Sequence, residues 1–296
     1  LPAVVERIGA VDVGGPALAI ASGWQHTCAL LETRAVRCWG EGSQGRLGYG
    51  NSANVGRDNL PSSAGDVSLG AVAKQVVAGG THTCALLFDG QVRCWGSSPE
   101  HGGNTYEAIG DNEVPSARGV VEIAAAGEMV EELAAGENHT CARLNTGAVR
   151  CWGQSSLGRL GVPGSSTIGD NETPLSQPTV QLGGPATQIA AGGMHTCARL
   201  ADGTVRCWGY GLYGQLGNLR SESIGDNEDP DTSPVVDVGE QVRSLALGQN
   251  FSCAVTTSGH LRCWGLSDLG RLGYGTGEWI GDDETPASAG DVPLLP

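Results

Sequence analysis

Basic residues and aromatic residues are both scarce in this 296-residue chain. Phe, Trp and Tyr make up 5% of it, and Lys74 is the one lysine among 17 basic residues. The 32 acidic residues give a net charge of −15. Such a surface repels phosphate backbones and anionic membrane surfaces. We therefore expect no nucleic-acid partner.

Long apolar runs and the familiar catalytic motifs are absent as well. No stretch of about 18 apolar residues occurs, so we expect no membrane insertion. The chain has no initiator Met and no charged segment before an apolar one, so Leu1 is interpreted as the start of a processed or excised chain. No Gly-x-x-x-x-Gly-Lys, His-Glu-x-x-His or Gly-x-Ser-x-Gly motif occurs. We predict no catalytic residues, no enzymatic activity and no cofactor.

Glycine, by contrast, is abundant, and one dipeptide repeats at a fixed period. The 48 glycines favour a turn-rich all-β chain over long helices. Cys-Trp recurs every 56 or 57 residues, beginning at positions 38, 94, 151, 207 and 263. A fixed period of this length is typical of a repeat architecture. The chain is therefore predicted to be one domain over 1–296, with repeats at about 11–67, 68–123, 124–180, 181–236 and 237–296.

The fourth repeat shows most clearly what each unit forms. Four short apolar runs alternate with glycine and proline, and Asp202-Gly203 between two runs is a strong hairpin signal. Each unit is thus predicted to be a four-stranded antiparallel sheet. Because such a sheet cannot bury both faces alone, successive sheets must stack, and four strands per unit favour a β-propeller over a solenoid.

Three motifs carry a resemblance to a known family. They are Gly-x-x-His-Thr-Cys-Ala, Gly-x-Val-x-Cys-Trp-Gly and the Gly-Gln-Leu-Gly of 214–217. Together they resemble the regulator of chromosome condensation (RCC1-like) repeat family, in its secreted bacterial type with cysteine-paired blades. The resemblance implies a β-propeller. The best-known members have seven blades whereas five are visible here, and the second repeat carries 97–104 in place of the third motif.

The two ends of the chain suggest how the ring closes. Val11–Val13 and Val292–Leu294 both align with the outer run at Val236–Val238. We predict a closed five-bladed ring, in which one terminal segment completes a blade from the opposite end of the chain.

The ten cysteines form five pairs, each ten residues apart. Across a hairpin with a short loop, such residues fall opposite each other, close to disulfide distance. Closing each loop is worth roughly 3 kcal/mol in the chain-entropy model. We therefore predict one disulfide per blade, joining Cys28 to Cys38, Cys84 to Cys94, Cys141 to Cys151, Cys197 to Cys207, and Cys253 to Cys263.

A metal site is the alternative for these cysteines, because a histidine lies two residues before four of the first cysteines, at 26, 82, 139 and 195. Phe251 takes that place in the fifth repeat, and the spacing does not match zinc sites. In the family that the chain resembles, the histidine is a framework residue. Because disulfides persist in oxidising compartments, we expect a secreted, periplasmic or cell-surface protein.

An acidic element, Ile-Gly-Asp-Asn-Glu or a close variant, recurs in four repeats. Loop carboxylates are ligands that calcium prefers, but Asp and Asn before a proline more commonly cap their own turn. We favour the turn role and no metal, and keep calcium as an alternative. Its candidate ligands are Asp111, Glu113, Asp170, Glu172, Asp226, Glu228, Asp282 and Glu284.

Two tryptophans, Trp24 and Trp279, lie outside the repeated framework and are the candidate binding residues. A rigid propeller with loop-covered faces suits recognition. We predict a binding scaffold for a protein or another surface ligand. The alternatives are a structural module of a surface assembly or fibre, and an inhibitor or recognition domain of a secreted enzyme, since the resembling family includes a secreted bacterial enzyme inhibitor.

Overall fold

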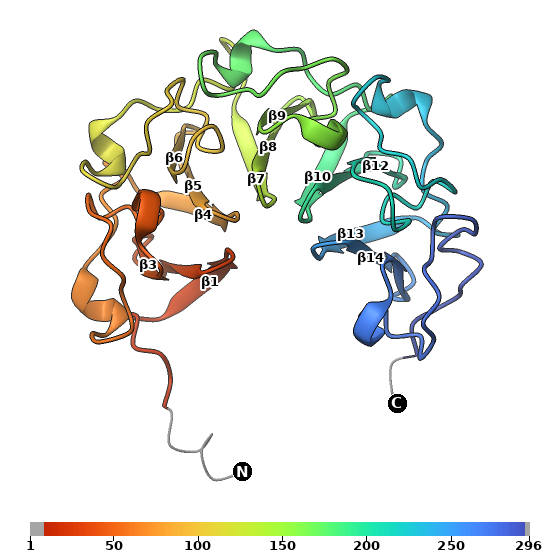
Figure 1. Cartoon of the computed structure of the whole chain (residues 1–296), viewed down its shortest axis with the longest axis horizontal. Coiled ribbons are helices and arrows are strands. Elements are labelled where there is room, and N and C mark those ends of the chain that lie inside the picture. Colours follow the sequence, from red (N-terminus) through yellow and green to blue (C-terminus); the bar gives the residue numbers. More distant parts are fainter. Residues whose placement is uncertain (1–8, 294–296) are drawn as a thin grey trace.

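The computed structural model describes residues 9–293, in which fifteen strands form five sheets arranged as an open arc (Figure 1). We call each sheet with the loop that follows it a blade, numbered 1 to 5 along the chain. Among the described residues, no helix is long and apolar enough to cross a membrane. The strands are β1 Ala17–Ser22, β2 His26–Leu31, β3 Val36–Gly40, β4 Ala73–Ala78, β5 His82–Leu87, β6 Val92–Gly96, β7 Val130–Ala135, β8 His139–Leu144, β9 Val149–Gly153, β10 Ala186–Ala191, β11 His195–Leu200, β12 Val205–Gly209, β13 Val242–Leu247, β14 Phe251–Thr256 and β15 Leu261–Gly265.

Short 3₁₀ helices punctuate the loops between sheets. Four of them begin at a proline that follows an extended residue, which suits the fixed φ of proline at a helix start. The 3₁₀ helices are η2 Ser43–Gly45, η3 Pro61–Ala64, η4 Pro115–Ala117, η5 Ser156–Gly158, η6 Pro174–Ser176, η7 Pro230–Thr232 and η8 Asp268–Gly270.

Each sheet is held in register by a tight hairpin between its second and third strands. In blade 4 the Leu200 amide donates to the Thr204 carbonyl at 2.9 Å, and Gly203 adopts a φ of 83°, which a side chain would disfavour. The Asp202 carboxylate accepts from the Thr204 amide and closes the turn. This register places Cys197 directly opposite Cys207.

The predicted all-β propeller architecture is confirmed, but each sheet has three regular strands where we expected four. The fourth segment touches its sheet at single points: in blade 4 the Val236 amide donates to the Val205 carbonyl, and Ile224 forms an isolated bridge with Gly209. Arg206, on β12, reaches the carbonyls of Pro230 and Ser233 instead. An arginine side chain thus ties the third strand to the 3₁₀ helix η7 and the residue after it.

Adjacent blades are joined by one set of contacts that repeats along the arc. The buried imidazole Nε2 of His82 lies 2.7 Å from the Thr140 hydroxyl of the next blade. The Trp152 indole N–H donates to the Glu100 carbonyl of the preceding blade at 3.0 Å. Matching histidine contacts join the other neighbours, from His26 to Thr83, His139 to Thr196 and His195 to Ser252. Each interface between blades is therefore formed by one face of a blade and the opposite face of the next blade.

The predicted closed ring is wrong. Along the arc β1 packs on β4 and β10 packs on β13, but no packing of comparable extent joins the first blade to the fifth within residues 9–293. Figure 1 shows the gap between the first and the fifth blade. Val292 completes its own blade by donating to the Leu261 carbonyl, so it is not exchanged across the ring.

The other terminal segment, Val11–Val13, lies at the edge of blade 1, where Asp12 accepts from the Ser62 amide. In the interior of the arc the equivalent backbone hydrogen bond joins the outer segment of one blade to the next blade. An example is the bond that the Ser116 amide donates to the Ser68 carbonyl. The alignment of the two ends was therefore correct, but Val11–Val13 has no sheet of its own to complete. Leu294 falls outside the described residues.

The faces at the two ends of the arc are left uncovered. Ile20 on β1 is 69% exposed, whereas Ile189 at the matching position of blade 4 is 4% exposed. Trp39 is half-buried, although its four counterparts are fully buried. At the other end, Phe251 and Cys253 on β14 are half-buried where their counterparts in the other blades are buried.

Candidate functional site

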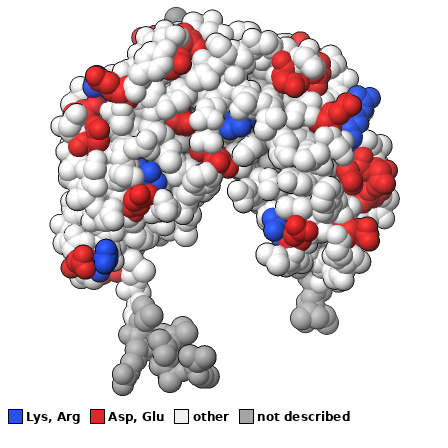
Figure 2. All heavy atoms as spheres, viewed as in Figure 1, with Lys and Arg blue, Asp and Glu red and all other residues white. Residues whose placement is uncertain are grey.

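The inner ends of all five sheets enclose a shallow hollow of about 260 Å³ on the concave side of the arc. Figure 2 shows this inner edge open toward the gap. Each blade contributes the last residue of its first strand and the turn that follows. The lining residues are Ser22, Gly23, Trp24, Ala78, Gly79, Gly80, Ala135, Gly136, Glu137, Ala191, Gly192, Gly193, Leu247, Gly248 and Gln249.

Glycine is the commonest residue lining this hollow, and the Gly-x-x-His motif explains one such glycine in each of blades 1 to 4. A Cβ added to Gly136 would lie 2.1 Å from Cε1 of His139 and 2.7 Å from the carbonyl oxygen of Gly192. The imidazole and the neighbouring turn therefore both require a residue without a side chain at this position. The Glu137 amide also donates to the Gly193 carbonyl, which fixes one turn against the next.

Two side chains give the hollow its chemistry. Trp24, at one end of the row, is 58% exposed. Glu137, near the middle of the row, has one carboxylate oxygen, Oε2, that is buried without a hydrogen-bond partner among the described residues. Burial raises the pKa of Glu137, and the nearby Arg159 charge partly offsets that rise. An exposed aromatic side chain and a half-buried carboxylate thus border one concave surface.

The four histidines are framework residues, neutral and buried. Burial lowers the pKa of His26 to about 4 and that of both His82 and His195 to about 3. The Ser252 hydroxyl, which His195 contacts, itself donates to the Gln215 carbonyl. His195 Nε2–H must therefore be the donor to Ser252, and its Nδ1 has no partner.

All ten cysteines are joined in the five predicted pairs. The S–S distances are 2.06–2.10 Å and the Cα–Cα distances are 4.0–4.1 Å. No cysteine is free. Since the sulfur atoms are bonded to each other, no thiolate is left for the histidine and cysteine metal site that was the alternative.

The acidic candidates lie one group to a blade, on separate loops, and the structure does not bring them together. In blades 3 and 4 the aspartate closes its own turn: Asp170 accepts from the Asn171 amide and Asp226 from the Asn227 amide, both at 2.9 Å. In blade 2 Glu113 forms an ion pair with Arg118 at 2.8 Å. These contacts favour the turn role, and calcium binding stays an untested alternative.

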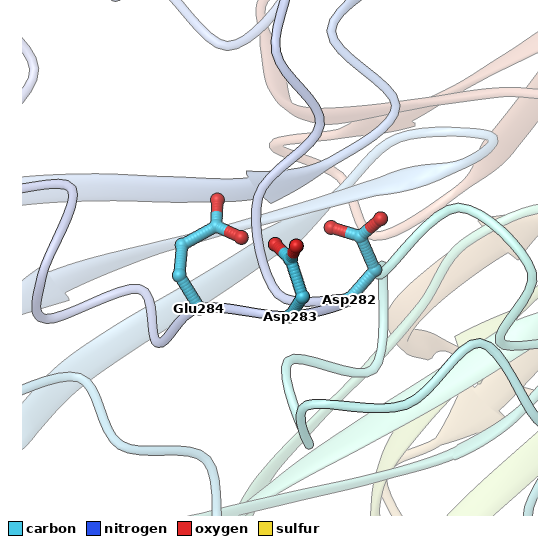
Figure 3. A group of neighbouring side chains, drawn as sticks. All are labelled: Asp282, Asp283 and Glu284. Atoms are coloured by element: carbon cyan, nitrogen blue, oxygen red, sulfur yellow. The ribbon is translucent and has the colours of Figure 1, made fainter.

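Blade 5 differs because three consecutive carboxylates lie side by side. One oxygen from each of Asp282, Asp283 and Glu284 lies within 4.8 Å of the others (Figure 3). Burial, followed by a hydrogen bond and charge repulsion from the two aspartates, raises the pKa of Glu284 to about 7. This loop therefore concentrates three carboxylates in a small volume.

An aromatic cluster beside this loop was missed from the sequence, apart from Trp279. Tyr213 packs edge-to-face on Tyr210 and on Trp279, with ring centroids 5.7 and 5.2 Å apart. The second candidate, Trp24, is separate from this cluster because it lines the hollow. The signal in the sequence was Tyr-x-x-Tyr in one loop of a chain with few aromatics, but only the fold brings Trp279 to it.

Comparison with known proteins agrees with this architecture. The regulator of chromosome condensation (RCC1) repeat matches five segments, 18–46, 73–102, 130–159, 186–215 and 242–271, and a second description of that repeat matches 36–86. The ultraviolet-B receptor UVR8 of Arabidopsis thaliana is 30% identical over 92% of this chain and 59% of its own. The human E3 ubiquitin-protein ligase HERC2 is 30% identical over 93% of this chain and 5% of its own.

The chain thus spans about three fifths of the receptor and a small part of the ligase. Among solved structures, human WBSCR16 has the same fold, with a TM-score of 0.70 at 21% identity over 89% of this chain and 65% of that one. The repeat resemblance is confirmed, and the secreted bacterial subtype stays a prediction. The five matched segments, one in each blade, show that the chain belongs to the regulator of chromosome condensation (RCC1) repeat family.

Proposed function

We propose that this chain is a protein-binding scaffold that receives a partner at the hollow on the concave side of the arc. The observation that carries the proposal is the convergence of all five blades on one glycine-rich surface that bears the exposed Trp24 and is bordered by Glu137. Concave surfaces with a few polar groups and an exposed aromatic side chain are typical of binding sites.

The relatives support binding over any one chemistry. The same repeat occurs in an ultraviolet-B receptor and in a ubiquitin ligase, whose names describe unrelated activities. A fold that serves such different proteins does not determine a function, which must come from the site. In this chain the site that the geometry offers is the recognition surface of the hollow.

We also propose that the chain works in an oxidising compartment, as a secreted, periplasmic or surface protein. Five disulfides, with every cysteine used, support this location because cytosolic reductants keep thiols reduced. The scaffold in this proposal needs no cofactor. The acidic surface disfavours nucleic acid as the partner.

Affinity capture from the medium or envelope fraction of the source cells tests the binding proposal. The baits are the unaltered chain, Trp24→Ala, and Phe88→Ala, which removes another exposed aromatic side chain away from the hollow. We expect a protein retained by the unaltered chain and by Phe88→Ala to be lost from Trp24→Ala. Equal retention by all three baits, or no retained protein, would refute the proposal.

A second candidate function, a module of a larger assembly, is favoured by the uncovered end faces of the arc. Ile20 and Trp39 at one end and Phe251 at the other are apolar side chains that neighbouring blades cover elsewhere. Light scattering across a hundredfold range of concentration tests this candidate. A rising mass supports assembly, and a constant monomer mass contradicts it.

A further inference from the structure

We propose that Tyr210, Tyr213 and Trp279, with the acidic loops on either side of them, form a docking surface for a basic segment of a partner protein. We call this surface the aromatic–acidic patch. The inference rests on the proposed protein-binding function and adds to it a second contact surface, on blades 4 and 5, with a defined chemistry.

The concentration of aromatic side chains is the first reason. The chain has 14 aromatic residues, and five of them are the tryptophans of the repeated Cys-Trp element. Two tyrosines, Tyr49 and Tyr274, bond through their hydroxyls to the backbone of Cys38 and Cys263. Of the seven that remain, three meet at the patch, and both aromatic contacts found among the described residues are there.

The geometry of the three rings leaves surface available to a ligand. Both ring pairs are perpendicular, with interplanar angles of 88°, so Tyr213 makes an edge-to-face contact with each of its two neighbours. Trp279 is 38% exposed and the adjacent Leu212 is 45% exposed, whereas the framework Trp264 of the same blade is fully buried. The patch is therefore an exposed apolar surface outside the packed core.

The backbone places this aromatic loop directly between two acidic loops. A Cβ on Gly214 would lie 2.7 Å from the Asp282 amide nitrogen, so the loop that carries Tyr213 packs on the acidic loop of blade 5. On the other side, a Cβ on Gly211 would lie 2.0 Å from the Glu222 carbonyl oxygen. These two glycines allow the close approach, and they bring carboxylates to both sides of the rings.

The charge around the rings defines the partner. Five carboxylates lie on the loops that adjoin the rings, and within residues 9–293 none of them has a basic side chain within 4.0 Å; they are Glu222, Glu278, Asp282, Asp283 and Glu284. Figure 2 shows acidic side chains gathered on the side of the arc formed by blades 4 and 5. Arg220 is a basic side chain on the same rim, beside Glu222 and Asp226. Unpaired carboxylates on both sides of the rings favour a ligand with several positive charges in sequence.

Arginine and lysine side chains match both components of the patch. A guanidinium or ammonium group stacks on aromatic faces and pairs with carboxylates at the same time. An extended basic segment would set one cation against the rings and its neighbours against the loops at Glu222 and Asp282. A single small cation would contact only part of this surface. We therefore propose a segment of a protein as the ligand.

The test uses a fluorescein-labelled peptide of alternating arginine and glycine, with a glutamate–glycine peptide of equal length as its control. Fluorescence anisotropy measures binding to the full chain at low and at moderate salt. We expect the arginine peptide to bind more weakly as salt rises, and the glutamate peptide not to bind. Trp279→Ala should weaken binding about tenfold, the loss expected for one cation–π contact.

Two comparisons separate the patch from general attraction to an acidic chain. Phe88→Ala removes an exposed aromatic with no change in charge and should bind as the unaltered chain does. Trp279→Phe keeps an aromatic face and should retain most of the affinity, which excludes misfolding as the cause of the loss in Trp279→Ala. Equal binding by Trp279→Ala and Phe88→Ala, or no peptide binding at all, would overturn the inference. The capture experiment with Trp24→Ala stands independently, so failure here would leave the binding at the hollow intact.

Discussion

The buried histidines make the arc less stable as the pH is lowered, and a single substitution isolates this effect. His195 is fully buried, and burial lowers its pKa in the folded chain to about 3, against 6.5 for an exposed histidine. Between these values the unfolded chain binds a proton that the folded chain does not. Stability therefore rises with pH, and the contribution of His195 is complete above 6.5 and is lost as the pH falls toward 3.

The magnitude follows from the difference between the two pKa values. Each pH unit below 6.5 costs about 1.4 kcal/mol for each such histidine, so at pH 4.5 His195 lowers the free energy of unfolding by about 2.7 kcal/mol. His195→Phe removes this proton uptake, and Phe251 occupies the same position of blade 5, where its ring packs on Gly248 as His195 packs on Gly192 but without a further blade beside it. The substitution also deletes the hydrogen bond from Nε2 to Ser252, at a cost of about 1 kcal/mol.

The two effects have opposite signs, so the stability curves should cross. At pH 7.5 His195→Phe should be less stable than the unaltered chain by about 1 kcal/mol. At pH 4.5 it should be more stable by about 1.7 kcal/mol. Urea unfolding between pH 4.5 and 7.5, with reversibility checked at each pH, measures both curves. Parallel curves would show that His195 titrates normally in the folded chain and would refute the reasoning.

Three further predictions concern the arc, the acidic loops and the cysteines. Ile189→Ala should lower the free energy of unfolding by about 2–5 kcal/mol, measured in urea, because Ile189 is buried between blades. Ile20→Ala, at the matching exposed position, should change that free energy by less than about 0.5 kcal/mol. Equal losses in the two variants would contradict an open arc. A chelator at matched ionic strength should leave the melting temperature unchanged if Asp170 and Asp226 only cap their turns, and a fall of more than about 5 °C, which a tightly held ion would produce, would contradict that role. Thiol titration of the unfolded, unreduced chain should find no free sulfhydryl, and ten reactive thiols would contradict the five disulfides.

Local features of each blade could be predicted from the sequence because they depend on short-range patterns. The ten-residue spacing of Cys197 and Cys207 with Asp202-Gly203 between them determined the hairpin, its register and the disulfide. The recurrence of these patterns indicated five stacked sheets. The loss of a regular fourth strand was not visible from the sequence, because the short apolar run at Val236 has the same pattern as a strand although the structure pairs it with Val205 through one backbone hydrogen bond.

Ring closure failed as a prediction because it depends on the angle between neighbouring blades, which no single repeat encodes. The alignment of Val11–Val13 with Val292–Leu294 was compatible with closure, but it did not require closure. The site shows the same limit. Trp24 was identified as lying outside the framework, yet the glycine-lined hollow beside it appears only when five distant turns converge.

The proposals on function and the open arc share one requirement, which is the exposure of particular tryptophans. Trp24 borders the hollow, Trp279 belongs to the aromatic–acidic patch, and Trp39 lies on the uncovered face of blade 1. The four remaining tryptophans are fully buried between blades, at 95, 152, 208 and 264. All seven are the same residue type, so their reactivities can be compared directly within one chain.

Hydroxyl-radical footprinting of the native chain, read by mass spectrometry, therefore tests the central claim, an open arc with accessible binding surfaces. We predict that Trp24, Trp39 and Trp279 are oxidised rapidly while the tryptophans at 95, 152, 208 and 264 stay protected until the chain unfolds. Protection of Trp39 equal to that of the buried four would contradict the open arc, and protection of Trp24 and Trp279 would remove the surfaces on which both binding proposals depend.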